Sequence, residues 1–230
     1  MKSYIICLSK IEESLNTATN LKKQLEEFDM PAVLFEGTYG NDAVDIMEKE
    51  NRTVHPFGIK GPQPVENNKS TDNNSKISSP GVRGCFLSHY RLWQTCVELD
   101  SPIIIWEDDI VLTRPYTPVE WQDVLVVALG HPKKSERYLS YLTDPEGMPE
   151  AMPYRNSSMP GCCGYAIKPH AARTLINTYA NTYLPADNAI NQYHVKIEIH
   201  NHIMGTALVG KGIKKSLTRT NFWNKLNEPQ

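Results

Sequence analysis

The N-terminal fifth of the chain shows a clear pattern of hydrophobic and polar positions. Residues 3–9 (SYIICLS) form a short apolar run that is typical of a buried strand. Over residues 11–29 the apolar side chains recur near helical spacing, and residues 32–37 (AVLFEG) form a second apolar run. A strand, a helix and a strand in such quick succession are typical of the βαβ unit of a parallel sheet. The pattern therefore predicts a Rossmann-like α/β fold.

The same patterns predict the remaining elements. Helices are expected over residues 42–50, 83–100, 119–129, 170–183 and 185–194, and strands over residues 102–108, 137–143, 164–169 and 195–200. No internal repeat and no domain boundary is visible. We therefore expect a single α/β domain over residues 1–230, with a mixed, mainly parallel sheet flanked by helices.

One long segment lacks any periodicity. Residues 60–82 are polar and rich in Asn, Ser, Pro and Gly, a composition that is typical of a flexible loop within the domain. Loops of this length in compact domains are either functional lids or disordered insertions, and the sequence leaves both open.

Composition narrows the class of protein. Hydrophobic residues make up 40% of the chain and charged residues 22%, and the formal net charge is -2. This charge argues against a broad nucleic-acid-binding surface. The five cysteines include no CxxC pair, which favours reduced thiols. Because neither a signal-peptide pattern nor an apolar segment of membrane-spanning length is visible, we expect a cytoplasmic protein.

The strongest chemical signal is an acidic run at the end of a predicted strand. Residues 103–106 are apolar (IIIW) and lead directly into Glu107, Asp108 and Asp109. In an extended backbone Glu107 and Asp109 point to the same side, and the carboxyl ends of strands are where open α/β sheets bind ligands. The run is either a polar strand end or a site for a hard divalent cation such as Mg²⁺ or Mn²⁺.

Several segments together resemble glycosyltransferase family 25, which includes lipooligosaccharide and collagen galactosyltransferases. The resemblance is carried by a Gly-Cys-x-x-Ser-His segment at residues 84–89 and the acidic run at residues 107–109. Residues 161–176 are similar to a later Gly-x-x-x-Tyr segment of the family, and residues 183–191 to its Pro-x-Asp segment. The chain departs from the family after the first strand, where the usual arginines are missing, so the donor contacts there are in doubt.

The resemblance implies a GT-A-type fold and an inverting, UDP-sugar-dependent enzyme, most often a β-galactosyltransferase. It implies a divalent cation, Mn²⁺ or Mg²⁺, and an oligosaccharide or lipid-linked glycan as acceptor. It also suggests peripheral association with the inner face of a membrane. The donor sugar's epimer, the acceptor and the oligomeric state are not encoded in any motif.

The resemblance also assigns residue roles. Asp109 is the expected metal ligand, while Glu107 or Asp108 contacts donor ribose or metal-bound water. His200 and His202 lie on the same side of a predicted strand. His202 is the favoured second metal ligand. The residues assigned to donor binding are Ser9, Glu36, Gly84, Ser88, His89, Glu107 and Asp108.

Asp187 is the candidate catalytic base. It matches the later aspartate of the family, and an inverting displacement needs a base near the acceptor hydroxyl. The alternative is a helix N-cap, because Asp187 precedes an apolar-periodic stretch and aspartate is a favoured cap residue.

Two other classes of protein compete with this interpretation. A metal-dependent phosphoryl-transfer enzyme or hydrolase could use the same acids, but the chain lacks a Walker-type phosphate loop and a Gly-x-Gly-x-x-Gly segment after the first strand. A catalytically inactive module that binds a nucleotide sugar or a glycan is the second alternative, favoured by the missing arginines.

Overall fold

The structure is a computed structural model that describes residues 1–55, 78–129, 158–159, 161–200 and 204–207. The predicted strand at residues 137–143, the candidate ligand His202 and residues 60–77 of the predicted loop lie outside the described residues.

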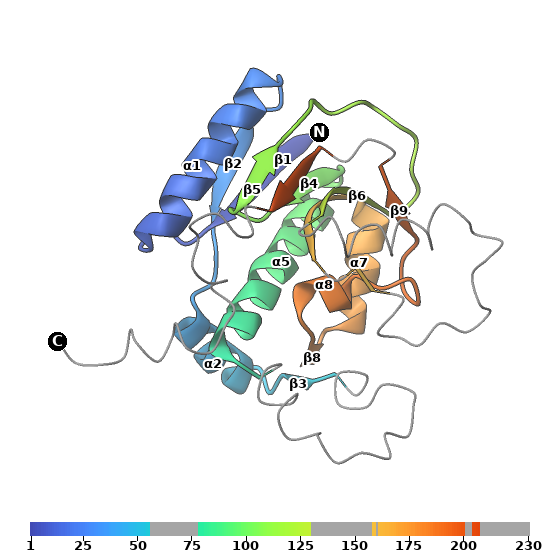
Figure 1. Cartoon of the computed structure of the whole chain (residues 1–230). Coiled ribbons are helices and arrows are strands. Elements are labelled where there is room, and N and C mark those ends of the chain that lie inside the picture. The colour runs from blue at the N-terminus through green and yellow to red at the C-terminus, as the bar shows by residue number, and fades with distance from the viewer. Residues whose placement is uncertain (56–77, 130–157, 160, 201–203, 208–230) are drawn as a thin grey trace, which may run out of the picture.

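A mixed sheet forms the centre of the fold (Figure 1). It has eight strands, with β9 paired to β6 beside the main order β2-β1-β4-β7-β6-β10-β5. The strands are β1 (Lys2–Cys7), β2 (Ala32–Glu36), β4 (Ile103–Trp106), β5 (Ile110–Leu112), β6 (Val124–Leu129), β7 (Cys162–Ile167), β9 (Ile197–Ile199) and β10 (Gly205–Ala207). β1 runs parallel to both β2 and β4, whereas β7 is antiparallel to β4 and β6.

Helices cover both faces of the sheet (Figure 1). They are α1 (Glu12–Glu27), α2 (Gly40–Lys49), α5 (Pro80–Leu99), α7 (Pro169–Thr178) and the short α8 (Ala186–Ala189). α1 packs on one face, against β1, β2 and β5. α5 lies on the other face with α2 and α7 beside it, and a small second sheet pairs β3 (Thr53–Val54) with β8 (Thr182–Tyr183).

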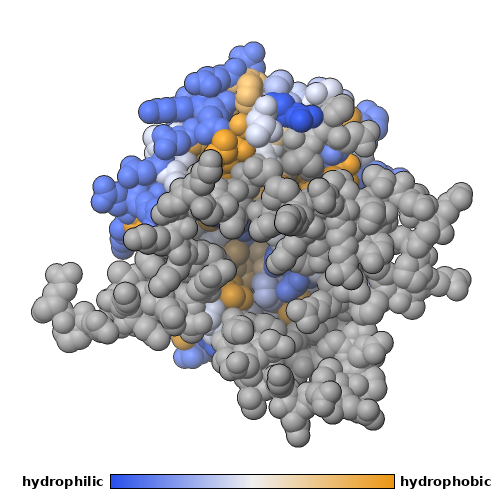
Figure 2. Space-filling model, viewed as in Figure 1, coloured by the Kyte–Doolittle hydropathy of each residue, from blue (hydrophilic) through white to orange (hydrophobic). Residues whose placement is uncertain are grey.

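The amphipathic pattern of α1 explains its position. Its buried residues are Ser14, Ala18, Leu21 and Leu25, which lie on one helical stripe. The outer side of the helix is polar, and Figure 2 shows hydrophilic side chains over it. The buried stripe joins Ile5 and Ile104 in an apolar cluster on this face of the sheet.

Most of the predicted architecture is confirmed. The N-terminal strand–helix–strand unit, the helices at residues 42–50 and 83–100, and the strands at residues 102–108 and 195–200 all have counterparts in the structure. The strand and helix predicted between residues 164 and 183 correspond to β7 and α7. The prediction of an α/β fold with a mixed sheet between helices is therefore correct.

The helix predicted over residues 119–129 is wrong, because residues 124–129 form strand β6. All six residues of β6 are buried, since the strand lies between β7 on one side and β9 and β10 on the other. A strand buried on both faces shows a continuous apolar run without alternation, which cannot be distinguished from a buried helix by periodicity.

Two further boundaries differ from the prediction. The helix expected over residues 185–194 is limited to α8, because the backbone returns to an extended conformation at Ile190. The predicted loop also ends earlier than expected, since α5 begins at Pro80. Ser79 caps this helix by accepting a hydrogen bond from the Val82 amide, and proline is favoured in the first helical turn.

Gly84 allows α5 to approach the loop that follows β2. A Cβ atom at this position would lie 2.5 Å from the carbonyl oxygen of Thr38. Ser88, one turn further along α5, accepts a hydrogen bond of 2.8 Å from the Thr38 amide and donates one of 2.7 Å to the Gly84 carbonyl. The helix and the loop are thus held in direct backbone contact.

We predict that Gly84→Ala destabilises the protein. In an unconstrained helix this change stabilises by about 1 kcal/mol through helix propensity. Here the added methyl group must displace backbone, and such overpacking costs about 1–3 kcal/mol. Urea denaturation followed by circular dichroism measures the free energy of unfolding. An increase in that free energy for Gly84→Ala would contradict the close approach of helix and loop.

Candidate functional site

The carboxyl ends of β1, β2 and β4 meet at one edge of the sheet because these strands are parallel. Ser9 follows β1, Glu36 ends β2, and Glu107 follows β4. The Ser9 amide donates a hydrogen bond of 3.2 Å to the Glu36 carboxylate. The three sequence-predicted residues therefore belong to the same edge, which is where open α/β sheets bind ligands.

The acidic run forms a turn between β4 and β5 at this edge. The Glu107 amide donates a hydrogen bond of 2.8 Å to the carbonyl of Cys163 in β7. The hydroxyl of Ser14 donates to the carboxylate of Asp108 and accepts a hydrogen bond of 2.9 Å from the Leu8 amide. Ser14 thus ties the acidic turn to the loop after β1.

Burial and mutual repulsion raise the pKa values of the carboxyl groups in the turn. For Asp108 the pKa rises to about 7, because desolvation and the charge of Asp109 outweigh the hydrogen bond from Ser14. Desolvation also raises the pKa of Asp109. The pKa of Glu107 is raised first by desolvation and then by Asp109, Asp187 and Asp108, so Asp187 lies close enough to act on it. Four carboxyl groups therefore gather at one place, where a cation would relieve their repulsion.

Asp109 has the features expected of a ligand for a hard cation. Its Oδ1 atom is buried and has no hydrogen-bond partner in the part of the chain that the structure describes. A buried carboxylate oxygen without a partner is costly, and oxygen ligands are those that Mg²⁺ and Mn²⁺ prefer. The residues of the acidic turn therefore fit a divalent cation.

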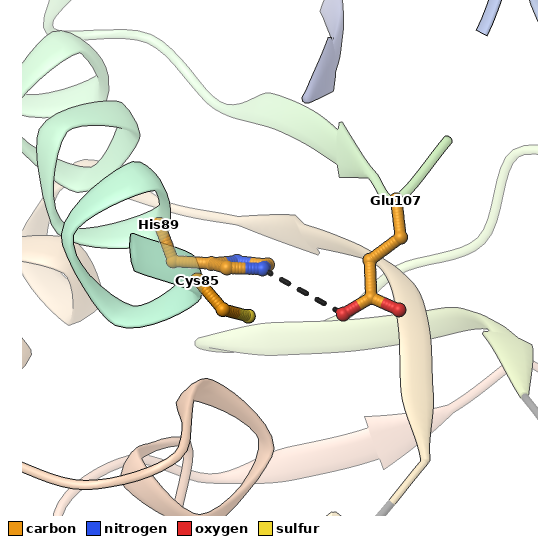
Figure 3. Close-up of side chains that lie close together, drawn as sticks. All are labelled: Cys85, His89 and Glu107. Carbon is orange, nitrogen blue, oxygen red and sulfur yellow. Dashed lines mark ion pairs between the residues drawn. The ribbon is translucent and has the colours of Figure 1, made fainter. Parts of the chain in front are cut away.

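His89 lies opposite the acidic turn, on α5 (Figure 3). Its Nε2 atom is 3.9 Å from the Glu107 carboxylate, and its Nδ1 atom is 2.9 Å from the hydroxyl of Tyr165. That hydroxyl also accepts a hydrogen bond of 2.9 Å from the indole of Trp93. Desolvation lowers the pKa of His89 to about 4, so the imidazole is neutral at physiological pH.

Gly84 and Ser88 act structurally in this conformation. Gly84 provides the space for the Thr38 carbonyl, and both hydrogen-bonding capacities of the buried Ser88 hydroxyl are used by the Thr38 amide and the Gly84 carbonyl. Their direct contact with a donor stays a prediction.

A cavity of about 650 Å³ lies between the ends of β1 and β2 and the helices α2 and α5. Ser9 and Glu36 line it together with Arg91, whose guanidinium group lies over the Phe35 ring at 5.1 Å. Partial burial would raise the pKa of Glu36, but hydrogen bonds from Ser9 and Tyr39 lower it below its ordinary value. The cavity therefore contains an ionised carboxylate and a guanidinium group at the ends of β1 and β2.

The alternative of an N-cap role for Asp187 is not what the structure shows. The residue before α8 is Pro185, and Asp187 lies inside the first turn of the helix. Its carboxylate accepts a hydrogen bond of 3.0 Å from the amide of Gly161, at the start of β7. The side chain is therefore held near Glu107 by a contact between distant segments.

The histidine alternatives are only partly described. His200 is buried, and its Nε2 atom lies 2.6 Å from the carbonyl of Thr117. His202 lies outside the described residues, so its metal role stays a prediction.

Sequence reasoning missed three residues of this site: Ser14, Trp93 and Tyr165. Ser14 is 94 positions from Asp108, and Tyr165 is 76 positions from His89. Trp93 lies within the helix predicted over residues 83–100. No local pattern signals such long-range hydrogen bonds.

Comparison with known families identifies the family to which the chain belongs. The sequence model of Glycosyltransferase family 25 (LPS biosynthesis protein) matches residues 1–190, which include the acidic turn, α5 and Asp187. The chain belongs to glycosyltransferase family 25.

Individual relatives are more distant. The chain is 54% identical over 33 residues to the lipooligosaccharide biosynthesis protein lic2B of Haemophilus influenzae, a match that covers 14% of this chain and 12% of the relative. A crystal structure of apo mouse xyloside xylosyltransferase 1 aligns over 89% of this family 25 chain and 82% of its own, with 9% identity and a TM-score of 0.34. That score is too low to support a conclusion.

None of the helices in the described ranges is long and apolar enough to cross a bilayer.

We predict that Asp108 makes stability depend on pH. In the folded state the pKa of the Asp108 carboxyl group is raised to about 7, whereas in the unfolded state the group ionises near its ordinary pKa of 3.8. Between these values the folded state binds more protons, so the free energy of unfolding falls as pH rises, by at most about 1.4 kcal/mol per pH unit for one group. Asp108→Asn should flatten this decline.

The measurement is urea denaturation in EDTA at several pH values between 4 and 7. Asp45→Asn, an exposed aspartate on α2, is the matched control and should keep the wild-type slope. Glu107 and Asp109 leave a residual slope in Asp108→Asn. An unchanged slope in Asp108→Asn would contradict the assignment.

Proposed function

We propose that the protein transfers a hexose, galactose in our preferred assignment, from a UDP-sugar to a hydroxyl group of an oligosaccharide or lipid-linked glycan. The transfer inverts the anomeric configuration and uses Mn²⁺ or Mg²⁺. The observation that carries this proposal is the acidic turn at the carboxyl end of β4, with a buried Asp109 oxygen that has no hydrogen-bond partner in the described residues, in a chain of glycosyltransferase family 25.

Asp109 holds the cation in this proposal, and Glu107 or Asp108 contacts the donor ribose or metal-bound water. The support is the buried Asp109 oxygen without a hydrogen-bond partner in the described residues and the raised pKa values of its neighbours. A divalent cation supplies charge stabilisation for the leaving diphosphate. The protein's contribution is to fix the acidic turn, through Ser14 and the backbone of β7, before the donor arrives.

The cavity at the ends of β1 and β2 accepts the nucleoside part of the donor. Its volume of about 650 Å³ lies within the usual range for small-molecule sites. Ser9 and Glu36, both predicted donor-binding residues, line it, and Glu36 is positioned to accept hydrogen bonds from hydroxyl or base N–H groups. Lys10 and Arg91 supply positive charge there, although the family's first-loop arginines are missing.

Asp187 acts as the general base. An inverting displacement needs a carboxylate that takes the proton of the acceptor hydroxyl on the face opposite the leaving group. The hydrogen bond from the Gly161 amide orients this carboxylate. The contribution of Asp187 to the raised pKa of Glu107 supports a position close to the acidic turn.

The acceptor is a lipooligosaccharide-type glycan in this proposal. The support is the description of the family model and of the matched relative as lipopolysaccharide or lipooligosaccharide biosynthesis proteins. Synthesis of such glycans from nucleotide sugars fits a cytoplasmic protein that works at the inner face of the membrane.

We predict that Asp109→Asn abolishes cation-dependent donor binding. In the wild type, UDP-galactose at ~100 times its dissociation constant with Mn²⁺ should add ~2.7 kcal/mol to the stability, and EDTA should remove the effect. Asp109→Asn should show no difference between Mn²⁺ and EDTA. Thermal-shift assays with UDP-galactose, UDP-glucose and UDP measure this. Equal stabilisation of wild type and variant would overturn the assignment of Asp109.

We predict that Asp187→Asn separates binding from transfer. Donor stabilisation should persist, because the amide keeps the size of the side chain and can still accept from Gly161. The transfer rate should fall by roughly 10²–10⁴-fold, the usual contribution of a general base. The rate is measured by UDP release in the presence of a glycan acceptor.

Asp45→Asn is the control for both aspartate variants and should match the wild type. Donor binding by the wild type without any hydrolysis or transfer would instead favour the inactive binding module. A transfer rate in Asp187→Asn close to that of the wild type would exclude Asp187 as the base.

A further inference from the structure

Three metal-ligating side chains converge between α5 and the acidic turn (Figure 3). Cys85 and His89 are four positions apart and so lie on the same side of α5, while Glu107 reaches toward them from the end of β4. One ligand atom of each residue lies within 4.8 Å of those of the other two. Donors around one tetrahedral zinc ion are separated by roughly 3.5 Å, so a small contraction closes the site.

The histidine in this cluster has an unused ligand atom. The His89 side chain is only 3% exposed, and its Nε2 atom has no hydrogen-bond partner within the described ranges. Nε2 is also the atom that faces the Glu107 carboxylate. A buried polar atom left without a partner is rare in native proteins and requires an explanation.

The surroundings of His89 resemble those of a metal-bound imidazole. Ligating histidines usually use their second ring nitrogen in a hydrogen bond that fixes the ring. Here Nδ1 lies 2.9 Å from the Tyr165 hydroxyl, and the Trp93 indole donates to the same oxygen. The two aromatic residues hold the imidazole in place before any metal arrives.

Glu107, the third member of the cluster, is more exposed to solvent than His89. The Glu107 side chain is 37% exposed, whereas His89 is almost fully enclosed. A carboxylate on a partly exposed side chain can move by the small distance that separates the present geometry from coordination. Solvent access on this side also leaves room for a fourth ligand, as in zinc sites that keep one open position.

We propose that Cys85, His89 and Glu107 form a binding site for a thiophilic transition metal of the Zn²⁺ class, distinct in ligand type from the carboxylate-based site at Asp109. Thiolate and imidazole ligands select zinc and related ions, whereas Mg²⁺ and Mn²⁺ prefer oxygen. Binding displaces the thiol proton of Cys85 and any proton on Glu107 into solvent, and the neutral imidazole binds through Nε2 while its remaining proton lies on Nδ1.

The site shares Glu107 with the proposed donor site. Zinc bound to Glu107 withdraws this carboxylate from the donor, so the metal should inhibit transfer. This consequence rests on the proposed function, whereas metal binding itself does not.

Co²⁺ is the probe for metal binding, because its absorption reports the ligands directly. Titration of the full, metal-free chain with Co²⁺ should produce a thiolate-to-cobalt charge-transfer band in the near ultraviolet and d–d bands typical of tetrahedral coordination. Addition of Zn²⁺ should abolish both. The readout needs neither donor nor acceptor, so it is independent of catalysis.

Two variants identify the ligands. Cys85→Ser should abolish the charge-transfer band, and His89→Gln should weaken Co²⁺ binding at least tenfold. Cys96→Ser is the matched control, because its thiol lies further along the same helix and contacts the carbonyls of Ser101 and Ile167. It should leave the spectrum unchanged, and circular dichroism verifies the fold of each variant.

Two results would overturn the proposal: no charge-transfer band in the wild type, or a band that persists in Cys85→Ser. The activity arm measures the ratio of transfer rates with and without Zn²⁺ for each variant. The proposed metal site is supported if Cys85→Ser requires a higher Zn²⁺ concentration for inhibition than Cys96→Ser does. If no variant transfers sugar, the spectra still decide the metal site, and only the proposed transferase function fails.

Discussion

Electrostatic repulsion between carboxyl groups is the constraint around which this end of the molecule is organised. Glu107, Asp108 and Asp109 are consecutive in the sequence. The fold brings Asp187 near them from α8, a much later segment of the chain. A protein that needed only a polar strand end would gain nothing from this arrangement, because each added carboxylate raises the cost of ionising the others. The arrangement makes physical sense when positive charge is bound there during function.

The rest of the fold holds these groups against their repulsion. The parallel arrangement of β1, β2 and β4 places their carboxyl ends at one edge, and β7 fixes the acidic turn through the Glu107 amide. Helix α5 contacts both the loop after β2 and the acidic turn. One side of it meets the loop after β2 at Gly84, and another side presents His89 to the acidic turn.

Local sequence patterns predicted the framework but not the contacts that complete the site. The βαβ unit and α5 follow from apolar periodicity, and the acidic turn follows from three consecutive letters at a strand end. Strand β6 was mistaken for a helix because burial on both faces removes the alternation that identifies a strand. The hydrogen bond between Asp187 and Gly161 joins residues that are 26 positions apart in the sequence. No local sequence pattern at either position predicts this contact.

The two cation sites proposed here differ in the chemistry of their ligands. The Asp109 carboxylate, with its buried Oδ1 atom, offers only oxygen, which suits a hard ion that works with a phosphate-bearing donor. The sulfur of Cys85 and the imidazole of His89 suit a softer ion, and these residues come from the helix, whereas Asp109 comes from the turn. Glu107 lies between the two sets and can serve either.

Because one carboxylate cannot be fully engaged by both, occupancy of the softer site and use of the donor site oppose each other. That opposition follows from the position of Glu107 alone, since it is the residue at which α5 and the acidic turn meet.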